Sequence, residues 1–345
     1  MKAPELPDGL SGPVRMSDVA RVAGVARVTV SRVLSNPQSV APATRAAVQD
    51  AIAKLGYVPN LNAGTLASSR SRIVGCIVPT LSNAWFAETI DGLSEVLAAA
   101  GYQLLLGQSG YGPVGEERLV DTFLGRRVDA MVLTGSERSD AVRTRLAAAG
   151  IPVVETWDLG LEPLDMAVGF SNYAVGEAAA EHLMARGCRR LGYIGADEQR
   201  AGKRFAGFAA TLARHDLKAV SALAGPPPTS FESGARALLA LMAQEPQLDG
   251  VFCSNDTLAA AVLFECRRQG WPVPQQMAVV GFSDQPLAAA TVPSLTSVQV
   301  RAQELGAEAG RMLLRRLGSA SSGKPLGGEH RVADMGFRMV ARESA

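Results

Sequence analysis

Residues 18–36 read Asp-Val-Ala-Arg-Val-Ala-Gly-Val-Ala-Arg-Val-Thr-Val-Ser-Arg-Val-Leu-Ser-Asn and predict two short helices. Ser17 precedes them and is a preferred N-cap, because its side-chain oxygen can accept hydrogen bonds from the first helical turn. Gly24 predicts the end of the first helix, since glycine tolerates the positive φ that a helix C-terminus often needs. The second helix fits Arg27 to Leu34. Two short helices joined by a tight glycine-containing turn are typical of a helix-turn-helix, whose second helix can enter the major groove of DNA.

These helices have an apolar seam and a more polar face. The positions that can pack between them are Val19, Ala23, Val25, Val30 and Val33. The positions left largely outside are Arg27, Val28, Thr29, Ser31 and Arg32. A third amphipathic helix is predicted over residues 43–55, and Gly56 ends it. An ordinary helical hairpin is the alternative interpretation, since helix pairs rich in Val and Ala are common.

The whole run resembles the DNA-binding headpiece of the LacI/GalR family of repressors. The matching residues are Asp18-Val19-Ala20, Ala23-Gly24-Val25, Thr29-Val30-Ser31-Arg32-Val33-Leu34, Thr44-Arg45 and Leu55-Gly56-Tyr57-Val58-Pro59-Asn60. The resemblance implies a homodimer whose two headpieces (residues 16–60) bind the half-sites of a near-palindromic double-stranded DNA operator. It implies contacts with base edges by Arg27, Val28 and Arg32. It implies positions nearer the phosphates for Thr29, Ser31 and Asn36. The remaining expected DNA-binding residues are Ser17, Tyr57, Asn60 and Leu66.

Residues 61–72 match the hinge of that family, a segment that forms a short helix on the operator. Leu66 occupies the position of the apolar side chain that wedges into a minor-groove step. Unstacking costs a few kcal/mol, offset by the contacts that bent DNA permits. Gly64 and Ser68-Ser69 make the free segment a poor helix, which favours folding on DNA. A flexible linker with an incidental leucine is the alternative.

Charge is distributed unevenly along the chain. Residues 15–72 hold eight basic and two acidic residues, a balance of +6, so the rest carries −5 of the net +1. This is the pattern of a basic DNA-binding module with an appended domain that need not touch phosphates. The four cysteines and three histidines are scattered, without metal-ligand or disulfide spacing. Residues 1–15 are expected to be a disordered tail, no signal peptide or membrane span is predicted, and a cytoplasmic location is expected.

From Ile73 onward, apolar runs of strand length alternate with amphipathic helices. The predicted strands are 73–78, 102–107, 129–134, 152–156, 191–195, 250–254 and 277–282. This alternation predicts an α/β core of two doubly wound parallel-sheet lobes, with ligand binding at the carboxyl ends of the strands. It resembles the periplasmic-binding-protein-like core of the same family, in which the chain crosses between lobes three times. The expected crossings lie near residues 171, 298 and 326, with an N-lobe of 73–171 and 299–325 and a C-lobe of 172–298 and 326–342.

Residues 110–115 match the dinucleotide-binding pattern G-x-G-x-x-G and lie between a predicted strand and helix. A dehydrogenase interpretation is weakened because Pro113 lacks the N–H that should face a pyrophosphate. The glycines also follow the second strand of their unit, whereas the fingerprint belongs to the first. We therefore favour a flexible surface loop. The sequence predicts no cofactor, no metal site and no catalytic residues.

Residues 73–342 resemble the family's effector domain, most closely that of the gluconate-responsive repressors. The similar stretches include residues 79–83, 86–88, 110–111, 117–119, 149–155, 167–172, 246–256 and 264–266. Arg204 aligns with the effector-contacting arginine, and its guanidinium can hold a carboxylate or vicinal hydroxyls. Asn255 and Asp256 follow a predicted strand and could read hydroxyl groups or only cap the next helix. The remaining expected effector-binding residues are Ser82, Asn83, Phe86, Thr134, Trp157 and Ser283.

Two of these positions have a competing interpretation. Phe86 or Trp157 could stack on the carbon skeleton of a sugar, but Phe86 also begins a helical core face. Many relatives have Gly-Tyr-Asp where this chain has Gly281-Phe282-Ser283, and their aspartate binds sugar hydroxyls. The missing carboxylate mildly favours an acidic ligand, although Asp284 could replace it.

The expected function is a sequence-specific transcriptional repressor of a sugar-acid catabolic operon, released from DNA by gluconate or a ketogluconate. A neutral sugar or a purine as the effector, and a corepressor in place of an inducer, remain open. Two alternatives come from other classes: a solute-binding protein of a transport system and an NAD-linked sugar-acid enzyme.

Overall fold

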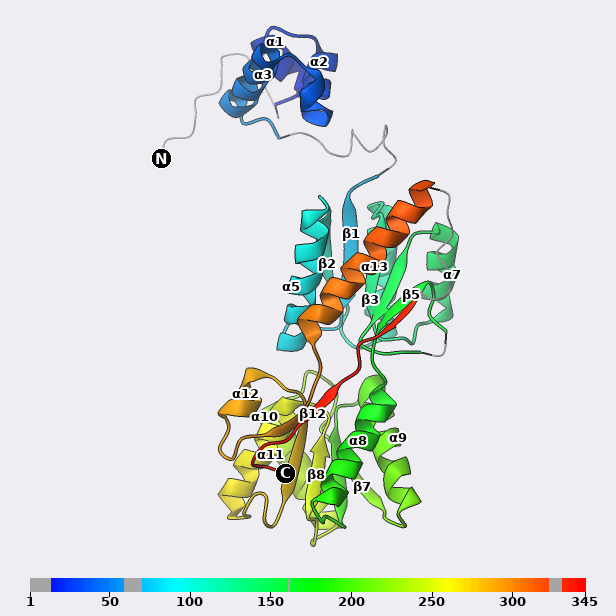
Figure 1. Ribbon diagram of the computed structural model, residues 1–345, viewed down its shortest axis with the longest axis vertical. Helices are drawn as coiled ribbons and strands as arrows, with labels where there is room; N and C mark the ends of the chain where they lie inside the picture. Colours follow the sequence, from blue (N-terminus) through cyan, green and yellow to red (C-terminus); the bar gives the residue numbers. More distant parts are fainter. Residues whose placement is uncertain (1–13, 59–69, 161, 323–330) are drawn as a thin grey trace. The chain divides into compact units, whose positions relative to one another are not determined.

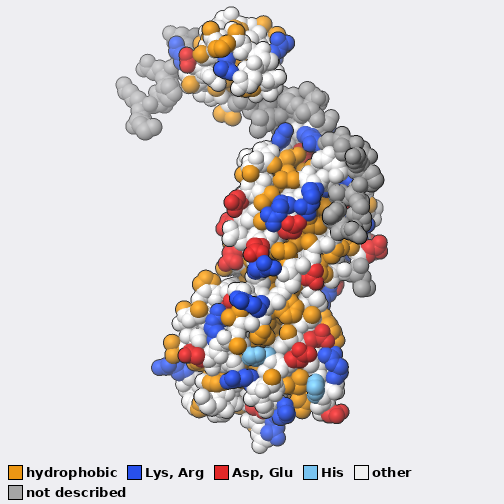
Figure 2. All heavy atoms as spheres, viewed as in Figure 1, with side chains coloured by type: hydrophobic (Ala, Val, Ile, Leu, Met, Phe, Trp, Pro, Cys, Tyr) orange, Lys and Arg blue, Asp and Glu red, His pale blue; other side chains and the backbone are white. Residues whose placement is uncertain are grey.

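The structure, a computed structural model, describes residues 14–58, 70–160, 162–322 and 331–345, except for the side chains of 320–322 (Figure 1). The chain divides into two compact units, residues 1–71 and residues 72–345. We call the first the headpiece and the second the core. Over the described ranges, no helix is long and apolar enough to span a membrane. On the face of the core drawn in Figure 2, basic and acidic side chains are interspersed.

The headpiece contains the predicted helix-turn-helix. Its helices are α1 (Met16–Val22), α2 (Arg27–Ser35) and α3 (Pro42–Leu55), with a short 3-10 helix η1 (Pro37–Ser39) between the last two. Gly24 and Gly56 have φ angles of +64° and +62°, as expected for residues that follow helix ends. The buried residues that join the three helices are Val19, Ala20, Val30, Val33, Val48, Ala51, Leu55 and Tyr57, with Ala23 and Val25 partly buried beside them.

The start of α1 differs from the prediction. The helix begins at Met16, so Ser17 lies inside its first turn, exposed, and is not the N-cap. Arg15 is the N-cap residue, and its backbone N–H donates to Asp18 Oδ2 at 2.9 Å. A carboxylate three residues into the helix therefore accepts from the backbone N–H of the N-cap residue, and Ser17 has no capping role.

The core is built from two six-stranded sheets with the same strand order. The first lobe contains β1 (Ile73–Val78), β2 (Gln103–Gln108), β3 (Ala130–Thr134), β4 (Val153–Thr156), β5 (Met166–Gly169) and β11 (Val332–Asp334), arranged β2-β1-β3-β4-β5-β11 and all parallel. The second lobe contains β6 (Leu191–Gly195), β7 (Ala219–Leu223), β8 (Gly250–Cys253), β9 (Ala278–Ser283), β10 (Thr296–Gln299) and β12 (Arg338–Val340), arranged β7-β6-β8-β9-β10-β12, with β12 antiparallel. This is the predicted architecture.

Helices cover both faces of each sheet (Figure 1). Those of the first lobe are α5 (Ala84–Ala99), α6 (Pro113–Gly125), α7 (Asp140–Ala149) and α13 (Ala302–Ser322). Those of the second are α8 (Asn172–Ala185), α9 (Gln199–Arg214), α10 (Phe231–Gln244), α11 (Asp256–Gln269) and α12 (Pro286–Ala290). Buried apolar strands between helical layers explain why the strands read as apolar runs without alternation.

The third crossing between lobes lies later than predicted. Residues 332–334 still pair with β5 of the first lobe, and residues 338–340 pair with β10 of the second, so the chain crosses at 335–337 and not near 326. The first two crossings fall between β5 and α8 and between β10 and α13, close to the predicted positions. The late strands were missed because each is only three residues long and neither is fully buried.

Two helix pairs pack at glycines. A Cβ placed on Gly176 of α8 would lie 1.9 Å from the carbonyl oxygen of Arg204, and one on Gly207 of α9 would lie 2.0 Å from that of Tyr173. Gly92 of α5 and Gly306 of α13 are equally close to backbone of the opposite helix. Only glycine permits so close an approach. The α8–α9 contact matters for the site, because it fixes the helix that carries Arg204.

Candidate functional site

The strand order reverses at the same place in both sheets. In the first lobe β1 lies between β2 and β3, and in the second β6 lies between β7 and β8. Chains leaving such neighbouring strands go to opposite faces and leave a crevice at their carboxyl ends, where ligands of open α/β sheets bind. The loops after β1, β3, β6 and β8 supply residues to the hollows described next.

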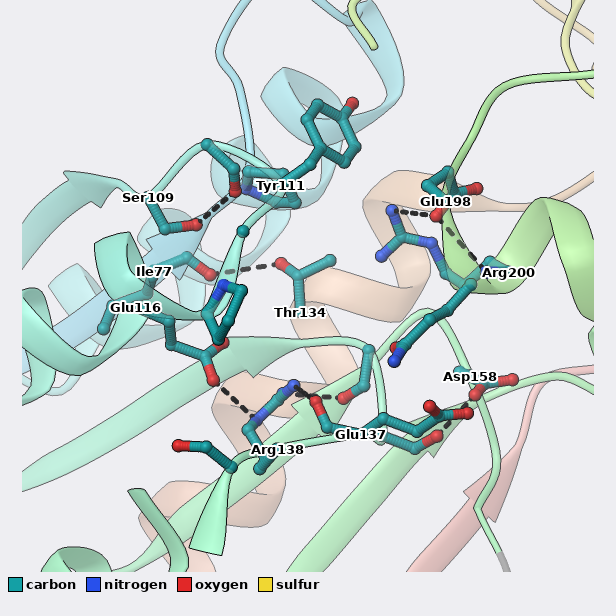
Figure 3. Close-up of a pocket in the computed structure, with 18 of the residues that line it drawn as sticks. Ile77, Ser109, Tyr111, Glu116, Thr134, Glu137, Arg138, Asp158, Glu198 and Arg200 are labelled. Carbon is teal, nitrogen blue, oxygen red and sulfur yellow. Dashed lines mark hydrogen bonds and ion pairs between the residues drawn. The ribbon is translucent and has the colours of Figure 1, made fainter. Parts of the chain in front are cut away.

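Two neighbouring hollows lie between the lobes. The larger, which we call the outer cleft, has a volume of about 760 Å³ and is drawn in Figure 3. The smaller, the inner hollow, has a volume of about 30 Å³. Tyr111, Glu198 and Arg200 line both, so the two hollows adjoin at these side chains. The other polar residues of the inner hollow are Asn83, Arg204, Thr229, Ser254 and Asn255, together with Trp85, Trp157 and Phe282.

Arg204 forms part of the wall of the inner hollow. It is 5% exposed, and its guanidinium lies 4.3 Å from the centre of the Phe282 ring. Nη1 donates to Asn172 Oδ1, while Nη2 donates to the Ser254 carbonyl at 3.3 Å and to Glu198 Oε1 at 3.4 Å. Arg204, which the family resemblance assigned to the effector site, therefore lines the inner hollow with both terminal nitrogens bonded within the protein.

Glu198 and Arg200 stand where the two hollows meet. Glu198 caps helix α9, since its carboxylate accepts from the backbone N–H groups of Ala201 at 2.9 Å and Arg200 at 3.3 Å. Its Oε2 also lies 3.2 Å from Arg200 Nη2. Burial would raise the pKa of Glu198, but Arg200, Arg204 and the two backbone donors outweigh it and hold the pKa below its usual value. The carboxylate is therefore ionised.

A polar cluster joins the two lobes beside the outer cleft. Asp158, from the first lobe, is 2% exposed. Its carboxylate accepts from Ser136 Oγ of the same lobe, and from Asn172 Nδ2 at 2.9 Å and Lys203 Nζ of the second lobe. Lys203 Nζ also lies 3.4 Å from Glu137 Oε1. Burial alone would raise the pKa of Asp158, but these three donors lower it, so an anion holds the lobes together.

A second ion cluster supports the first-lobe wall of the outer cleft. The Arg138 side chain is 2% exposed and its Nε lies 3.4 Å from Glu116 Oε1. Nη2 donates to the Gly135 carbonyl at 2.7 Å. Burial lowers the pKa of Arg138, and Glu116 with Glu155 opposes this. Figure 3 shows Glu116 and Arg138 facing each other beneath Thr134.

Five of the nine predicted effector residues line these hollows, namely Asn83, Thr134, Trp157, Arg204 and Asn255. Asn255 caps α11, because its Oδ1 accepts from the Leu258 N–H at 2.9 Å, and it also lines the inner hollow. Trp157 is fixed by a bond from its Nε1 to Thr89 Oγ1 at 3.1 Å.

The other four predicted residues do not reach the hollows. Ser82 is exposed on the loop after β1. Phe86 is 1% exposed and packs edge-on against Trp157, so the core interpretation of this ring is confirmed. Asp256 is fully buried, and Ser283 points at it, with Oγ 3.3 Å from Asp256 Oδ2. Asp284 does not replace the missing carboxylate, because it is paired with Arg342 at 2.7 Å.

Asp256 is a buried carboxyl beneath the site. It accepts from Ser297 Oγ at 2.6 Å and from the Gln285 N–H at 2.7 Å, and burial raises its pKa to about 7 despite these bonds. Between the ordinary carboxyl pKa and about 7, the folded state binds more protons than the unfolded state, so this group makes stability fall as the pH rises. We expect Asp256→Asn to flatten the dependence of unfolding free energy on pH over that range. Urea unfolding at several pH values measures this, and an unchanged slope would contradict it.

The sequence missed Tyr111, Asp158, Glu198 and Arg200. Tyr111 lies in the G-x-G-x-x-G segment, which lines the outer cleft and is not merely a surface loop. Its hydroxyl accepts from Asn83 Nδ2 at 3.2 Å, and burial raises its pKa to about 12, so the hydroxyl keeps its proton. Glu198 and Arg200 could have been found from the sequence, because they closely follow the apolar strand at 191–195. Ligands of open parallel sheets bind at the carboxyl ends of the strands.

In the headpiece, the second helix presents the predicted face. Arg27, Ser31 and Arg32 are exposed, Val28 is 62% exposed and Thr29 is half-buried. Asn36 is exposed at the end of the same helix, and Ser17 is exposed on α1. Tyr57 is 8% exposed and packs in the headpiece core, so most of this side chain serves packing. Asn60 and Leu66 lie outside the described residues.

Known proteins resemble both parts of the chain. Residues 15–60 match the family described as bacterial regulatory proteins, lacI family, and residues 180–345 match a periplasmic binding protein-like domain. The HTH-type transcriptional regulator GntR of Pseudomonas aeruginosa is 40% identical over 97% of this chain and 96% of its own length. The Escherichia coli K12 regulator of that name is 36% identical over 94% and 96%. A LacI-family regulator structure from Silicibacter pomeroyi superposes with a TM-score of 0.89 at 32% identity, covering 96% of this chain and 99% of that one.

These relatives decide between the classes of protein that the sequence left open. Those just compared with this chain are named as transcriptional regulators, and the resemblance extends over both the headpiece and the core. The NAD-linked enzyme suggested by residues 110–115 is therefore set aside, and so is a transport protein without a DNA-binding part. The chain belongs to the LacI family of DNA-binding transcriptional regulators.

Proposed function

We propose that this regulator represses a sugar-acid catabolic operon and leaves its operator when gluconate or a ketogluconate binds between the lobes. LacI-family regulators bind operator DNA and a small-molecule effector and act as dimers. The observation that carries the sugar-acid proposal is the pair of guanidinium groups, Arg200 and Arg204, on one wall of the inner hollow. Guanidinium groups bind carboxylates, and the hydroxyl, amide and carboxylate groups around them can bond a polyol.

The same arrangement gives a route from effector to DNA. Each lobe supplies residues to both hollows, so a ligand that fills them has a different affinity for different angles between the lobes. A ligand shifts the equilibrium between two arrangements only by its difference in affinity for them. The first lobe begins at β1, directly after the hinge segment. In a dimer, a movement of that lobe would therefore alter the distance between the two hinge segments.

The proposal is tested by thermal unfolding with gluconate, 2-ketogluconate, neutral hexoses and purines, followed by operator release with any ligand that stabilises. A ligand at about one hundred times its dissociation constant adds roughly 2.7 kcal/mol to the stability of the state it binds. Stabilisation and operator release by sugar acids support the proposal. Stabilisation only by a neutral sugar or a purine leaves the regulator in its family and rejects the sugar-acid assignment, and tighter operator binding would make the ligand a corepressor.

Leu66→Ala tests the hinge. If Leu66 wedges into a base step of a bent operator, its loss weakens operator binding by more than it weakens binding to nonspecific DNA, where no such bend forms. Binding titrations on operator and scrambled duplexes at one salt concentration measure both, since salt changes the phosphate contribution strongly. Equal losses on the two duplexes would reject the wedge.

A further inference from the structure

We infer that Arg200, and not the family-aligned Arg204, binds the carboxylate of the effector and sets the preference for an acid over a neutral sugar. This inference rests on the proposed function. It concerns two arginines one turn apart on helix α9, both in the wall of the inner hollow.

Both terminal nitrogens of Arg204 already donate to protein groups, and its Nε, which has no hydrogen-bond partner among the described residues, is buried. Nη1 is bonded to Asn172, and Nη2 is bonded to Glu198 and to the Ser254 carbonyl. One face of its guanidinium lies on Phe282. A ligand carboxylate that approached Nη1 and Nη2 would compete with these partners, and Asn172 is itself fixed, since it also donates to the Trp157 carbonyl at 3.0 Å and to Asp158 at 2.9 Å. Arg204 therefore holds the second lobe together and positions its neighbours.

Arg200 has donors available. Within the described chain its one ion pair joins Nη2 to Glu198 Oε2 at 3.2 Å, which leaves Nη1 and Nε without a protein partner. The guanidinium lies 5.6 Å from the centre of the Phe86 ring, which belongs to the first lobe. Arg200 lines both hollows, and Figure 3 shows its side chain reaching from α9 toward Tyr111 and Thr134. A fork of free N–H groups at that place is suited to a carboxylate.

Glu198 explains how an anion is accepted beside another carboxylate. Its Oε1 is held by the Ala201 N–H and by Arg204, so the charge of Glu198 is already shared with a second cation and a helix N-terminus. Arg200 can then bond the ligand through its other edge while Glu198 keeps its place. In this arrangement Glu198 accepts hydrogen bonds from ligand hydroxyls, and Arg200 distinguishes a carboxylate from a neutral group.

The charge of the outer cleft limits the ligand to a single anionic group. Its lining includes the carboxylates of Glu116, Glu137, Asp158, Asp197 and Glu198 and only two arginines, Arg138 and Arg200. A second anionic group placed in that cleft would meet more negative than positive charge. The effector class is therefore an unphosphorylated sugar monocarboxylate, held by its acid end at Arg200.

The test measures the ratio of affinities for gluconate and for its neutral amide, gluconamide, by calorimetry on the full chain. We expect Arg200→Gln to lower the affinity for gluconate about 10- to 100-fold, the range of a lost hydrogen bond to a charged group, and to bring the ratio close to one. Arg200→Lys should restore part of the preference, because the charge remains but the fork does not. Arg214→Gln, on the same helix but paired with Glu177 on the surface, should leave the ratio unchanged.

The outcomes separate this inference from the proposed function. If the wild-type chain binds gluconate and Arg200→Gln keeps the wild-type ratio, the carboxylate is bound elsewhere and the inference is overturned. Arg204→Gln then identifies Arg204 as the carboxylate ligand if it collapses the ratio. If the wild-type chain binds no sugar acid, both the proposed function and the inference are wrong. Tight binding of 6-phosphogluconate would overturn the restriction to a single anionic group.

Discussion

Gly207→Ala is expected to destabilise the core by about 3 kcal/mol, at the upper end of the usual cost of overpacking. A Cβ at this position would lie 2.0 Å from the carbonyl oxygen of Tyr173, which belongs to the backbone of the opposite helix and cannot rotate away. Helices α8 and α9 would have to move apart. Because α9 carries Arg200 and Arg204, and Gly176 packs on the Arg204 carbonyl, the same change should also weaken effector binding.

Gly202→Ala is the matched control on the same helix. Gly202 is exposed, and a Cβ built on it has no neighbour within 4 Å. Replacing a glycine by alanine there should stabilise the helix by up to about 1 kcal/mol, because alanine loses less conformational freedom on folding. Urea unfolding of the three chains gives the comparison. Equal unfolding free energies for Gly207→Ala and the wild type would show that the α8–α9 distance is not set by this contact.

The sequence predicted the parts of the fold that depend on local pattern. Each of these parts depends on only a few neighbouring residues. They are the seam of Val30 and Val33, the glycines after α1 and α3, and the apolar strands β1, β3, β6 and β8. The late crossing at 335–337 is not, because β11 and β12 gain their place only by pairing with β5 and β10, which lie far away in sequence. The N-cap error is local: Ser17 has the right chemistry, but the helix begins one residue before it, and Asp18 bonds the backbone of the N-cap residue Arg15.

The family resemblance predicted the site only as far as it identified residues near the carboxyl ends of the strands. Resemblance pointed to Arg204 and Asn255, which both line the inner hollow, but it could not show that both terminal nitrogens of Arg204 already donate to Asn172, Glu198 and Ser254. Nor could it show which of two polar residues after a strand faces the ligand. Asn255 lines the inner hollow and the next residue, Asp256, turns into the protein. These distinctions depend on side-chain direction and on partners from distant elements.

Asp158→Ala should cost about 3 kcal/mol of stability, the lower end of the range for removing one member of a buried ion pair. Asp158 is 2% exposed and accepts from Ser136, Asn172 and Lys203, so its removal takes one acceptor from each of three donors. The lower end applies because the Lys203 side chain is 31% exposed and can still reach water. Since the pKa of Asp158 is held below its usual value, its contribution is present at neutral pH and lost as the pH falls through that lowered pKa.

Glu137→Ala is the control for this change, because Glu137 Oε1 reaches the same Lys203 Nζ at 3.4 Å from a side chain that is 50% exposed. A surface pair of this kind contributes about 0–1 kcal/mol. If both variants lose the same stability at neutral pH, the buried network is not what holds the lobes in this arrangement.

The Asp158 network also connects lobe arrangement to the effector-binding wall. Asn172 donates to Asp158 and accepts from Arg204, which in turn bonds Glu198, the partner of Arg200. One chain of bonds therefore runs from the interlobe pair of Lys203 and Asp158 to the proposed carboxylate ligand. Because Glu198 bonds both arginines, a ligand that binds Arg200 acts on the same chain of bonds that sets the angle between the lobes. Asp158→Ala should accordingly change effector affinity, measured by calorimetry with gluconate, whereas Arg214→Gln, which removes a surface pair with Glu177, should not.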